Sequence, residues 1–338
     1  MDKKTNTVRG SSTILPKSDP PDKDDLNLPK IATELKIASL TFSGVYTALV
    51  TPLKADGQVD YEGLNNLVAL QIEQGINGLV AVGTTGESPT LTHSEHIAVV
   101  KAIVETTAGR IPVVAGVGSN NTAEAMELTQ LADKAGADAL MLVAPYYNKP
   151  NQEGLFQHCS KIAAVTEKPI ILYSIPSRCG IAIEVATAAR LYAKHPHVCA
   201  IKEAGGDANR VSQLRQSLGD SYMILSGDDS LTLPFMAVGA QGVISVASNL
   251  VVTDLVKMVD YALKNDFASA ERLHRRYYPL FKDLFIEPNP VPIKEALYES
   301  GILASKAVRS PLCPMSPDNR TRLLKTLKEL EIPLQGES

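Results

Sequence analysis

One lysine of the sequence lies within a run of residues that otherwise favours a buried strand. Lys202 occupies the segment VCAIKEA (198–204), between Ile201 and Glu203. Burial disfavours the charged form of an amine, so a lysine in such a strand is expected to have a lowered pKa. A neutral amine near neutral pH is the nucleophile that Schiff-base chemistry requires. The alternative is a structural lysine that pairs with Glu203 or extends to the surface.

Two further candidate residues lie in the segment YSIPSRCG (173–180). The phenol of Tyr173 can transfer protons to and from a carbinolamine formed on Lys202, provided that both side chains point to the same side. Arg178, just beyond Pro176, carries a planar guanidinium that can bind a substrate carboxylate through two hydrogen bonds. Alternatively, Tyr173 is a core tyrosine with a satisfied hydroxyl group, and Arg178 takes part in a surface ion pair.

Two loop-like segments bring more polar groups close to strand ends. GTTGES (83–88) combines glycines, which allow a close backbone approach, with two threonine hydroxyl groups, and this suits a small carboxylate or an oxyanion. It is not a phosphate-binding P-loop, because the pattern GxxxxGK[ST] is absent. APYYNKP (144–150) contains two adjacent tyrosines. Turn formation by glycine, asparagine and proline explains both segments equally well.

The elements that must position these residues are short apolar runs alternating with amphipathic stretches. Each run is rich in Val, Ile, Leu or Ala and lacks polar alternation, which is typical of strands covered on both faces. The predicted strands lie within 44–53, 78–83, 112–117, 139–145, 169–176, 198–204, 222–229 and 242–248. Capping boxes at the starts of two of the intervening helices are predicted from Thr92 with Glu95 and from Asn121 with Glu124.

Eight strands alternating with eight helices predict an α/β fold of the (β/α)8 TIM-barrel type, with the active site at the carboxyl ends of the strands. An open, doubly wound sheet is the alternative, but no GxGxxG motif follows the first strand. We expect a flexible N-terminal tail (1–43), a catalytic barrel (44–265) and a small C-terminal helical domain (266–338) in which helices flank the proline-rich connector EPNPVPIK. The tail mixes prolines and charges without hydrophobic periodicity.

Composition excludes several classes of protein. Of the 338 residues 44% are hydrophobic and 21% charged, which excludes wholesale disorder. A net charge of −4 provides no basic surplus for nucleic acid, and no run reaches the roughly 18 apolar residues of a membrane-spanning helix. The four cysteines have neither metal-site nor disulfide spacing. We therefore expect a soluble, cytoplasmic protein with no nucleic-acid or membrane partner and no metal site.

In their order along the chain, GTTGES, PYYNKP, YSIPSR, IKEA and SGDD resemble the motifs of the dihydrodipicolinate synthase family. This family belongs to the class I pyruvate-dependent aldolase superfamily, which includes N-acetylneuraminate lyase. The resemblance runs from about Gly44 to the C-terminal helices. It implies a lyase that condenses pyruvate with L-aspartate 4-semialdehyde through a lysine Schiff base, in the diaminopimelate route to lysine. It implies no metal and no organic cofactor.

The resemblance also implies a catalytic role for each matching residue. Lys202 would form the Schiff base with pyruvate, and Tyr173 would transfer the protons. Thr84 and Tyr147 would complete the proton relay. In the family Tyr147 is expected to reach into a neighbouring subunit, so the active unit would be at least a dimer and usually a dimer of dimers.

The same resemblance assigns substrate-binding residues. Thr85 would bind the carboxylate of pyruvate, and Arg178 that of aspartate semialdehyde. Ile244 of GVISV would place its backbone near pyruvate, and Gly227 of SGDD would also line the substrate site.

Two alternative functions follow from the same residues. Another pyruvate-dependent class I aldolase, of the 2-keto-3-deoxy acid or N-acetylneuraminate lyase type, would share Lys202 and Tyr173. Arg178 and the threonine pair favour the synthase, because the lyase relatives act on a sugar and lack that arginine. A catalytically idle barrel is disfavoured because both the lysine and the tyrosine are present.

Three residues depart from the family pattern. Ser174 stands where asparagine is common and Cys179 where threonine is common. Neither position is expected to do covalent chemistry, although both can alter the packing around Arg178. Pro89 is the third departure.

A separate group of residues matches the family positions that bind L-lysine, the end product, at a dimer interface. Glu124 and one or both histidines would accept hydrogen bonds from the ammonium group of lysine, and Tyr146 and Asn120 would hold its carboxylate. The presence of His96 favours inhibition, because some insensitive family members lack a histidine there. Alternatively, Glu124 only caps a helix and the histidines form a polar helix face. The group consists of Ser88, His93, His96, Asn120, Glu124 and Tyr146.

Overall fold

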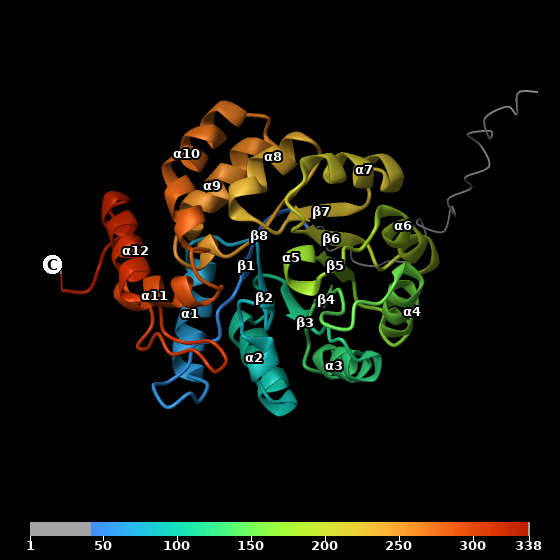
Figure 1. Ribbon diagram of the computed structural model, residues 1–338, viewed down its shortest axis with the longest axis horizontal. Coiled ribbons are helices and arrows are strands. Elements are labelled where there is room, and N and C mark those ends of the chain that lie inside the picture. Colours follow the sequence, from blue (N-terminus) through green and yellow to red (C-terminus); the bar gives the residue numbers. More distant parts are fainter. Residues whose placement is uncertain (1–41, 337–338) are drawn as a thin grey trace, which may run out of the picture. The chain divides into compact units, whose positions relative to one another are not determined.

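The structure, a computed structural model, describes residues 42–336, and within them eight parallel strands close into a barrel (Figure 1). The strands pair in chain order, and β1 pairs with β8 to complete the closure. The predicted (β/α)8 barrel is confirmed, and the open sheet is wrong. The strands are β1 (Gly44–Ala48), β2 (Gly78–Ala81), β3 (Val113–Gly116), β4 (Ala139–Val143), β5 (Ile170–Ser174), β6 (Ala200–Glu203), β7 (Met223–Ser226) and β8 (Gly242–Ser245).

Helices follow the strands and cover the outside of the barrel (Figure 1). Strand side chains are buried on both faces, since the helices cover one face and the barrel interior the other. No helix within residues 42–336 is both long and apolar enough to span a membrane. The helices of the barrel are α1 (Tyr61–Glu73), α2 (His93–Thr107), α3 (Thr122–Lys134), α4 (Gln152–Ala163), α5 (Pro176–Cys179), α6 (Val185–Lys194), α7 (Ala208–Leu218), α8 (Thr232–Ala237) and α9 (Val252–Leu263).

One of the two predicted capping boxes forms. At the start of α2, the Thr92 hydroxyl accepts from the N–H of Glu95, and the Glu95 carboxylate accepts from the N–H of Thr92. The box predicted for α3 is wrong. Asn121 does cap the helix, but its own N–H donates to the Ser119 hydroxyl at 3.1 Å. Ser119 thus takes the place that Glu124 was expected to fill, and the Glu124 carboxylate is left for other contacts.

Three helices follow the barrel: α10 (Phe267–Asp283), α11 (Val291–Glu299) and α12 (Pro317–Glu329). Helix α10 packs against α9, and α12 packs against α10 and α11, on one flank of the barrel (Figure 1). Helix α11 begins inside the proline-rich segment that we expected to be a connector. Its Pro292 lies in the first turn, where a missing N–H breaks no helical hydrogen bond. Nearly all of the predicted tail lies outside the described residues, and the proposed boundary at 265/266 falls between α9 and α10.

A buried ion pair joins α11 to the loop between β2 and α2. The ammonium group of Lys294 contacts one carboxylate oxygen of Glu87, and both side chains are excluded from solvent. The other Glu87 oxygen accepts from the backbone N–H of Arg309 at 2.9 Å. Lys294 also donates to the carbonyl of Ala307 at 2.9 Å. Both members of the pair are therefore held by the segment that follows α11.

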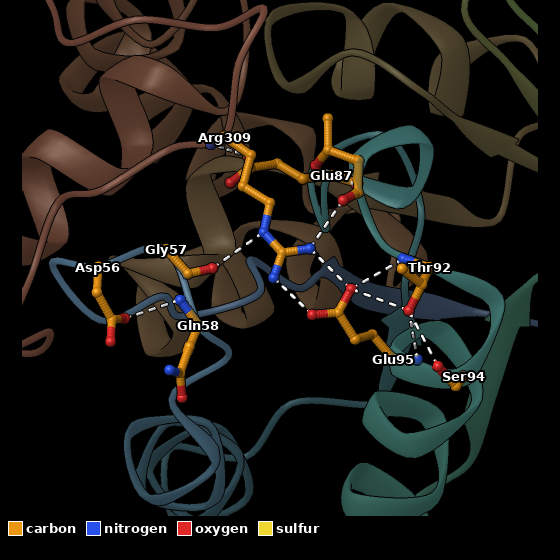
Figure 2. A network of polar contacts seen from close by, with 9 residues as sticks. Asp56, Gly57, Gln58, Glu87, Thr92, Ser94, Glu95 and Arg309 are labelled. Atoms are coloured by element: carbon orange, nitrogen blue, oxygen red, sulfur yellow. Dashed lines mark hydrogen bonds and ion pairs between the residues drawn. The ribbon is translucent and has the colours of Figure 1, made fainter.

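The Arg309 side chain extends this connection to two other parts of the barrel (Figure 2). Its guanidinium binds both carboxylate oxygens of Glu95, at 2.8 and 2.6 Å, and thereby lowers the pKa of Glu95 to about 2. It also donates to the carbonyls of Gly57 and Thr90, at 3.0 and 2.8 Å. The C-terminal region is thus attached to the start of α2 and to the loop that precedes α1.

We expect Lys294→Met to lower the free energy of unfolding by about 3–5 kcal/mol, because it leaves the Glu87 carboxylate buried without its partner. Adding Glu87→Gln should recover part of this loss, since a neutral amide is less costly to bury. Urea unfolding followed by circular dichroism measures both effects. As a control, Lys325→Met removes an exposed partner of Glu329 and should change stability by less than about 1 kcal/mol. Equal losses for the two lysine variants would contradict the importance of the buried pair.

Candidate active site

Lys202 and Tyr173 face each other inside the barrel. Tyr173 of β5 and Lys202 of β6 are register partners near the carboxyl ends of their strands. The Lys202 Nζ lies 4.3 Å from the centre of the Tyr173 ring, and the two residues are only 5% and 4% exposed. The condition that both side chains point to the same side is therefore met.

Both structural alternatives for Lys202 are wrong. The next residue along the strand, Glu203, pairs with Arg210 of α7 at 2.6 Å, because successive strand side chains point to opposite faces. Its carboxylate also accepts from the N–H of Gly205 at 2.8 Å. Lys202 is buried rather than extended to the surface.

The surroundings of Lys202 make its amine titrate close to neutral pH. Burial lowers the pKa of Lys202 to about 8; the carboxylates of Asp228 and Asp229 oppose this shift, and the Arg178 guanidinium adds to it. With this pKa, about one amine in ten is neutral at pH 7. Lys202 can therefore act as a nucleophile without assistance from a strong base.

Tyr173 is a proton donor rather than a phenolate at neutral pH. Burial raises its pKa far above the usual value, with Arg178 and a hydrogen bond to Thr84 acting in the opposite direction. That hydrogen bond satisfies the phenol group, as a core tyrosine would require. The Tyr173 ring nevertheless lies against Lys202, so the geometry suits proton transfer to a group bound there.

The β2–α2 loop is tightly folded against the barrel. A Cβ atom on Gly86 would lie 2.9 Å from the Cα of Val82, so the loop requires a glycine at this position. Thr51 donates to the carbonyl of Gly86 at 2.7 Å. The Thr85 side chain is buried, and its oxygen accepts from the amide of Asn289 at 3.0 Å. Turn formation and a binding role for the threonines are therefore compatible.

Arg178 is exposed at the end of α5 and is free of carboxylate partners within residues 42–336. Its guanidinium donates to the main-chain carbonyl of Asn289 at 3.3 Å. The predicted alternative, a surface ion pair, is therefore wrong. The two nearby departures from the family pattern have packing roles. Cys179 donates to the carbonyl of Ala144 at 3.1 Å, and the Ser174 hydroxyl accepts from the N–H of Ile183 at 3.3 Å.

Two further predicted residues lie just after β7 and within β8. Gly227 directly follows β7 and Ile244 is buried within β8. Asp229 is also buried, and its carboxylate accepts from the Ser245 hydroxyl and from two backbone N–H groups. We did not single out Asp228 and Asp229 from the sequence. The available signal was two consecutive carboxylates at the carboxyl end of a strand.

Tyr147 is not brought to this site within one chain. It lies in the β4–α4 loop, is 90% exposed and has a left-handed φ of +73°. Such a backbone conformation is uncommon for residues other than glycine. In a single chain, the Tyr147 side chain is therefore exposed to solvent and is not packed with Tyr173 and Thr84.

A second polar group gathers at the starts of α2 and α3. Glu124 lies at its centre, 2.6 Å from the Nε2 of His93, and its other oxygen accepts from Ser119. Tyr146 hydrogen-bonds to Ser119 through its side chain and accepts from Asn120 at its carbonyl, at 3.2 Å. These contacts bring together four of the residues that we predicted for a lysine site, and they add Ser119, which we did not predict.

The two histidines of this group differ. His93 is half exposed, as expected for a polar helix face. His96 is buried, and its Nε2 lies 2.8 Å from the carbonyl of Gly116. Burial lowers the pKa of His96 to about 4, so it is neutral at physiological pH. Ser88, in a 3₁₀ turn with the exposed Pro89, makes no side-chain hydrogen bond to this group.

Comparison with known proteins gives consistent matches. A model of the dihydrodipicolinate synthetase family matches residues 41–330. A 4-hydroxy-tetrahydrodipicolinate synthase of Persephonella marina is 50% identical over 85% of this chain and 98% of its own. A dihydrodipicolinate synthase of Acinetobacter baumannii, solved with pyruvate, has a TM-score of 0.84 and 43% identity over 86% of this chain and all of its own. The dihydrodipicolinate synthase of Cyanidioschyzon merolae, solved with lysine bound, has a TM-score of 0.84. It is 37% identical over 86% of this chain and 99% of its own.

We expect the Lys202 amine to react as a group with a pKa near 8. Acetic anhydride acylates only neutral amines, so the initial rate of Lys202 acetylation, followed by peptide mass spectrometry, should rise with pH to a midpoint near pH 8 and level off about one to two pH units above it. Asp228→Asn should move the midpoint to lower pH, because its carboxylate stabilises the charged amine. Asp220→Asn, at an exposed carboxylate near Arg215, is the matched control and should leave the midpoint unchanged. A midpoint near 10.5, the ordinary lysine value, would contradict a desolvated amine.

Proposed function

Since the chain belongs to the dihydrodipicolinate synthetase family and is a lyase of the 4-hydroxy-tetrahydrodipicolinate synthase type, we propose that it condenses pyruvate with L-aspartate 4-semialdehyde. The observation that carries this proposal is the buried Lys202 amine, with its pKa near 8, against the Tyr173 ring. A relative solved in complex with pyruvate supports the choice of the first substrate.

In the first half of the proposed reaction, the neutral amine of Lys202 attacks the carbonyl carbon of pyruvate. A proton moves from nitrogen to oxygen through Tyr173, and Tyr173 donates a second proton as the resulting hydroxyl group leaves as water, which gives a protonated imine. The Tyr173 phenolate then takes a proton from the methyl group, which gives the enamine and restores the phenol. Thr84 hydrogen-bonds to the phenol and supports its role as a relay. The Thr85 hydroxyl would bind the pyruvate carboxylate, near Gly227 and the backbone of Ile244.

In the second half, the enamine carbon attacks the aldehyde carbon of the semialdehyde, whose oxygen takes up a proton. The amine of the semialdehyde then attacks the imine carbon and expels Lys202 as a free amine. Arg178 would bind the carboxylate of this second substrate. Its guanidinium is exposed and contacts a carbonyl, Asn289 O, instead of a competing carboxylate, which supports this role.

Tyr147 supports an active unit of more than one chain. The structure keeps this tyrosine almost fully exposed on a left-handed backbone, although such a conformation costs free energy. A second copy of the chain would give the side chain a place in a proton relay with Thr84 and Tyr173. We propose at least a dimer, and a dimer of dimers as the full assembly.

The cluster around Glu124 supports inhibition by L-lysine. Hydrogen bonds from Ser119 and His93 lower the pKa of Glu124, so the carboxylate stays charged and can bind an ammonium group. Asn120 and Tyr146 would hold the ligand carboxylate. A relative solved with lysine bound supports this choice of ligand.

We expect turnover of pyruvate and aspartate semialdehyde, measured by coupling to reduction of the product, to fall at least about a thousandfold in Lys202→Ala, because the nucleophile is lost. Borohydride should trap pyruvate on Lys202 in the unaltered protein. Lys257→Ala, at an exposed lysine of α9, is the control and should keep full activity. Trapped pyruvate without turnover would favour the alternative, an aldolase with a different second substrate. No trapped pyruvate would refute the Schiff-base mechanism.

We expect L-lysine to inhibit this reaction, and Glu124→Gln to raise the half-inhibitory concentration at least about tenfold, because a charge-assisted hydrogen bond to the ammonium group is lost. The measurement is the ratio of activities with and without lysine. Glu127→Gln, at an exposed carboxylate on the same helix, should leave the inhibition curve unchanged. Activity that stays flat up to millimolar lysine would refute the proposed inhibition.

A further inference from the structure

Asn289 lies between the two side chains that we propose bind the substrate carboxylates. It precedes α11 and is 5% exposed. Its side-chain amide donates to the Thr85 oxygen at 3.0 Å, and its main-chain carbonyl accepts from Arg178 at 3.3 Å. A single residue of the C-terminal region thus contacts both proposed carboxylate sites, although it is 204 residues from Thr85 and 111 from Arg178 in the chain.

The hydrogen bond from Asn289 determines how Thr85 can interact with a ligand. An amide NH₂ group can only donate, so the Thr85 oxygen accepts and its hydrogen points elsewhere. A carboxylate can only accept hydrogen bonds. A hydroxyl that already accepts one hydrogen bond is polarised as a donor for a second. Asn289 therefore prepares Thr85 to donate to an anionic group.

The other end of the Asn289 amide shows that stability alone does not explain this residue. Its Oδ1 atom is buried and has no hydrogen-bond partner within residues 42–336. Such an unpaired acceptor reduces the stability of the fold. An apolar residue would avoid this cost, but it would leave the Thr85 oxygen without its donor.

The neighbouring ion pair holds Asn289 and Thr85 in this arrangement. Glu87 lies two residues after Thr85, and its partner Lys294 lies five residues after Asn289. The two segments are thus joined at two adjacent points, one of which is a fully buried pair of charges. The distance between Asn289 and Thr85 is therefore set by the packing of α11 against the β2–α2 loop.

We propose that Asn289 is a positioning residue for both substrates. Its side-chain amide makes Thr85 a hydrogen-bond donor to the carboxylate of the 2-oxo acid. Its main-chain carbonyl holds Arg178 for the carboxylate of the amino aldehyde. This inference rests on the proposed function and adds the residue that connects the two carboxylate sites.

The variant Asn289→Ala separates the two contacts, because it removes the side-chain amide and keeps the carbonyl. We expect the pyruvate concentration for half-maximal borohydride trapping on Lys202 to rise about tenfold, the effect of losing one oriented hydrogen bond. The KM for aspartate semialdehyde should stay within about twofold, since Arg178 keeps its acceptor. Asn319→Ala, which removes an amide bound to Glu287 in the same C-terminal region, should change neither value.

A variant without the Thr85 hydroxyl group shows whether the effect of Asn289 on pyruvate trapping depends on Thr85. In Thr85→Val, which lacks the hydroxyl, adding Asn289→Ala should change trapping by less than about twofold. Asn289→Asp retains the shape of the side chain, and its carboxylate would draw the Thr85 hydrogen away from pyruvate. It should therefore weaken trapping more than alanine does, and it provides the test if the alanine variant does not fold.

Several results would overturn the positioning role. In the first, Asn289→Ala reaches half-maximal trapping at the same pyruvate concentration as the unaltered protein. In the second, the pyruvate concentration for trapping and the KM for aspartate semialdehyde rise equally. In the third, adding Asn289→Ala to Thr85→Val still changes trapping tenfold. Weaker impairment by aspartate than by alanine would also overturn it. Failure of the unaltered protein to trap pyruvate is a different result, because it refutes the proposed function itself.

Discussion

A primary amine buried inside a protein is costly to keep charged, and the interior of this barrel is arranged around that cost. Complete isolation in an apolar interior can lower a lysine pKa to about 5–6, whereas full exposure leaves it above 10. Lys202 lies between these limits because Asp228 and Asp229 partly offset its desolvation. Burial of the amine makes it available as a nucleophile, and the two carboxylates keep its titration near neutral pH.

The carboxylates themselves are held by the same end of the barrel. Asp229 accepts from Ser245 and from backbone N–H groups at the end of β8, and these hydrogen bonds oppose the rise in its pKa that burial causes. Tyr173 responds to the same desolvation in the opposite sense, since burial keeps a phenol protonated. One physical condition, the exclusion of water, thus places an amine that is partly neutral at pH 7 next to a protonated phenol.

The C-terminal helices complete this site from outside the barrel. Lys294 pairs with Glu87, Asn289 contacts Thr85 and Arg178, and Arg309 binds Glu95. A buried ion pair is weak evidence for net stability, because desolvation offsets much of the attraction. Its effect here is geometric, since charges without access to solvent cannot exchange partners. The C-terminal region therefore positions the loop that carries Thr84 and Thr85.

The sequence by itself was sufficient to predict the barrel and the positions of its strands. These features are local, because apolar runs and the alternation of side chains along a strand depend on near neighbours in the chain. The tertiary structure alone revealed Asn289, Lys294 and Arg309, whose partners in the barrel lie more than a hundred residues away. It also showed that Ser119 replaces Glu124 at the start of α3 and that α11 begins within the proline-rich segment. Such contacts exist only once the barrel has closed and brought distant loops together, and no local pattern records which loops will meet.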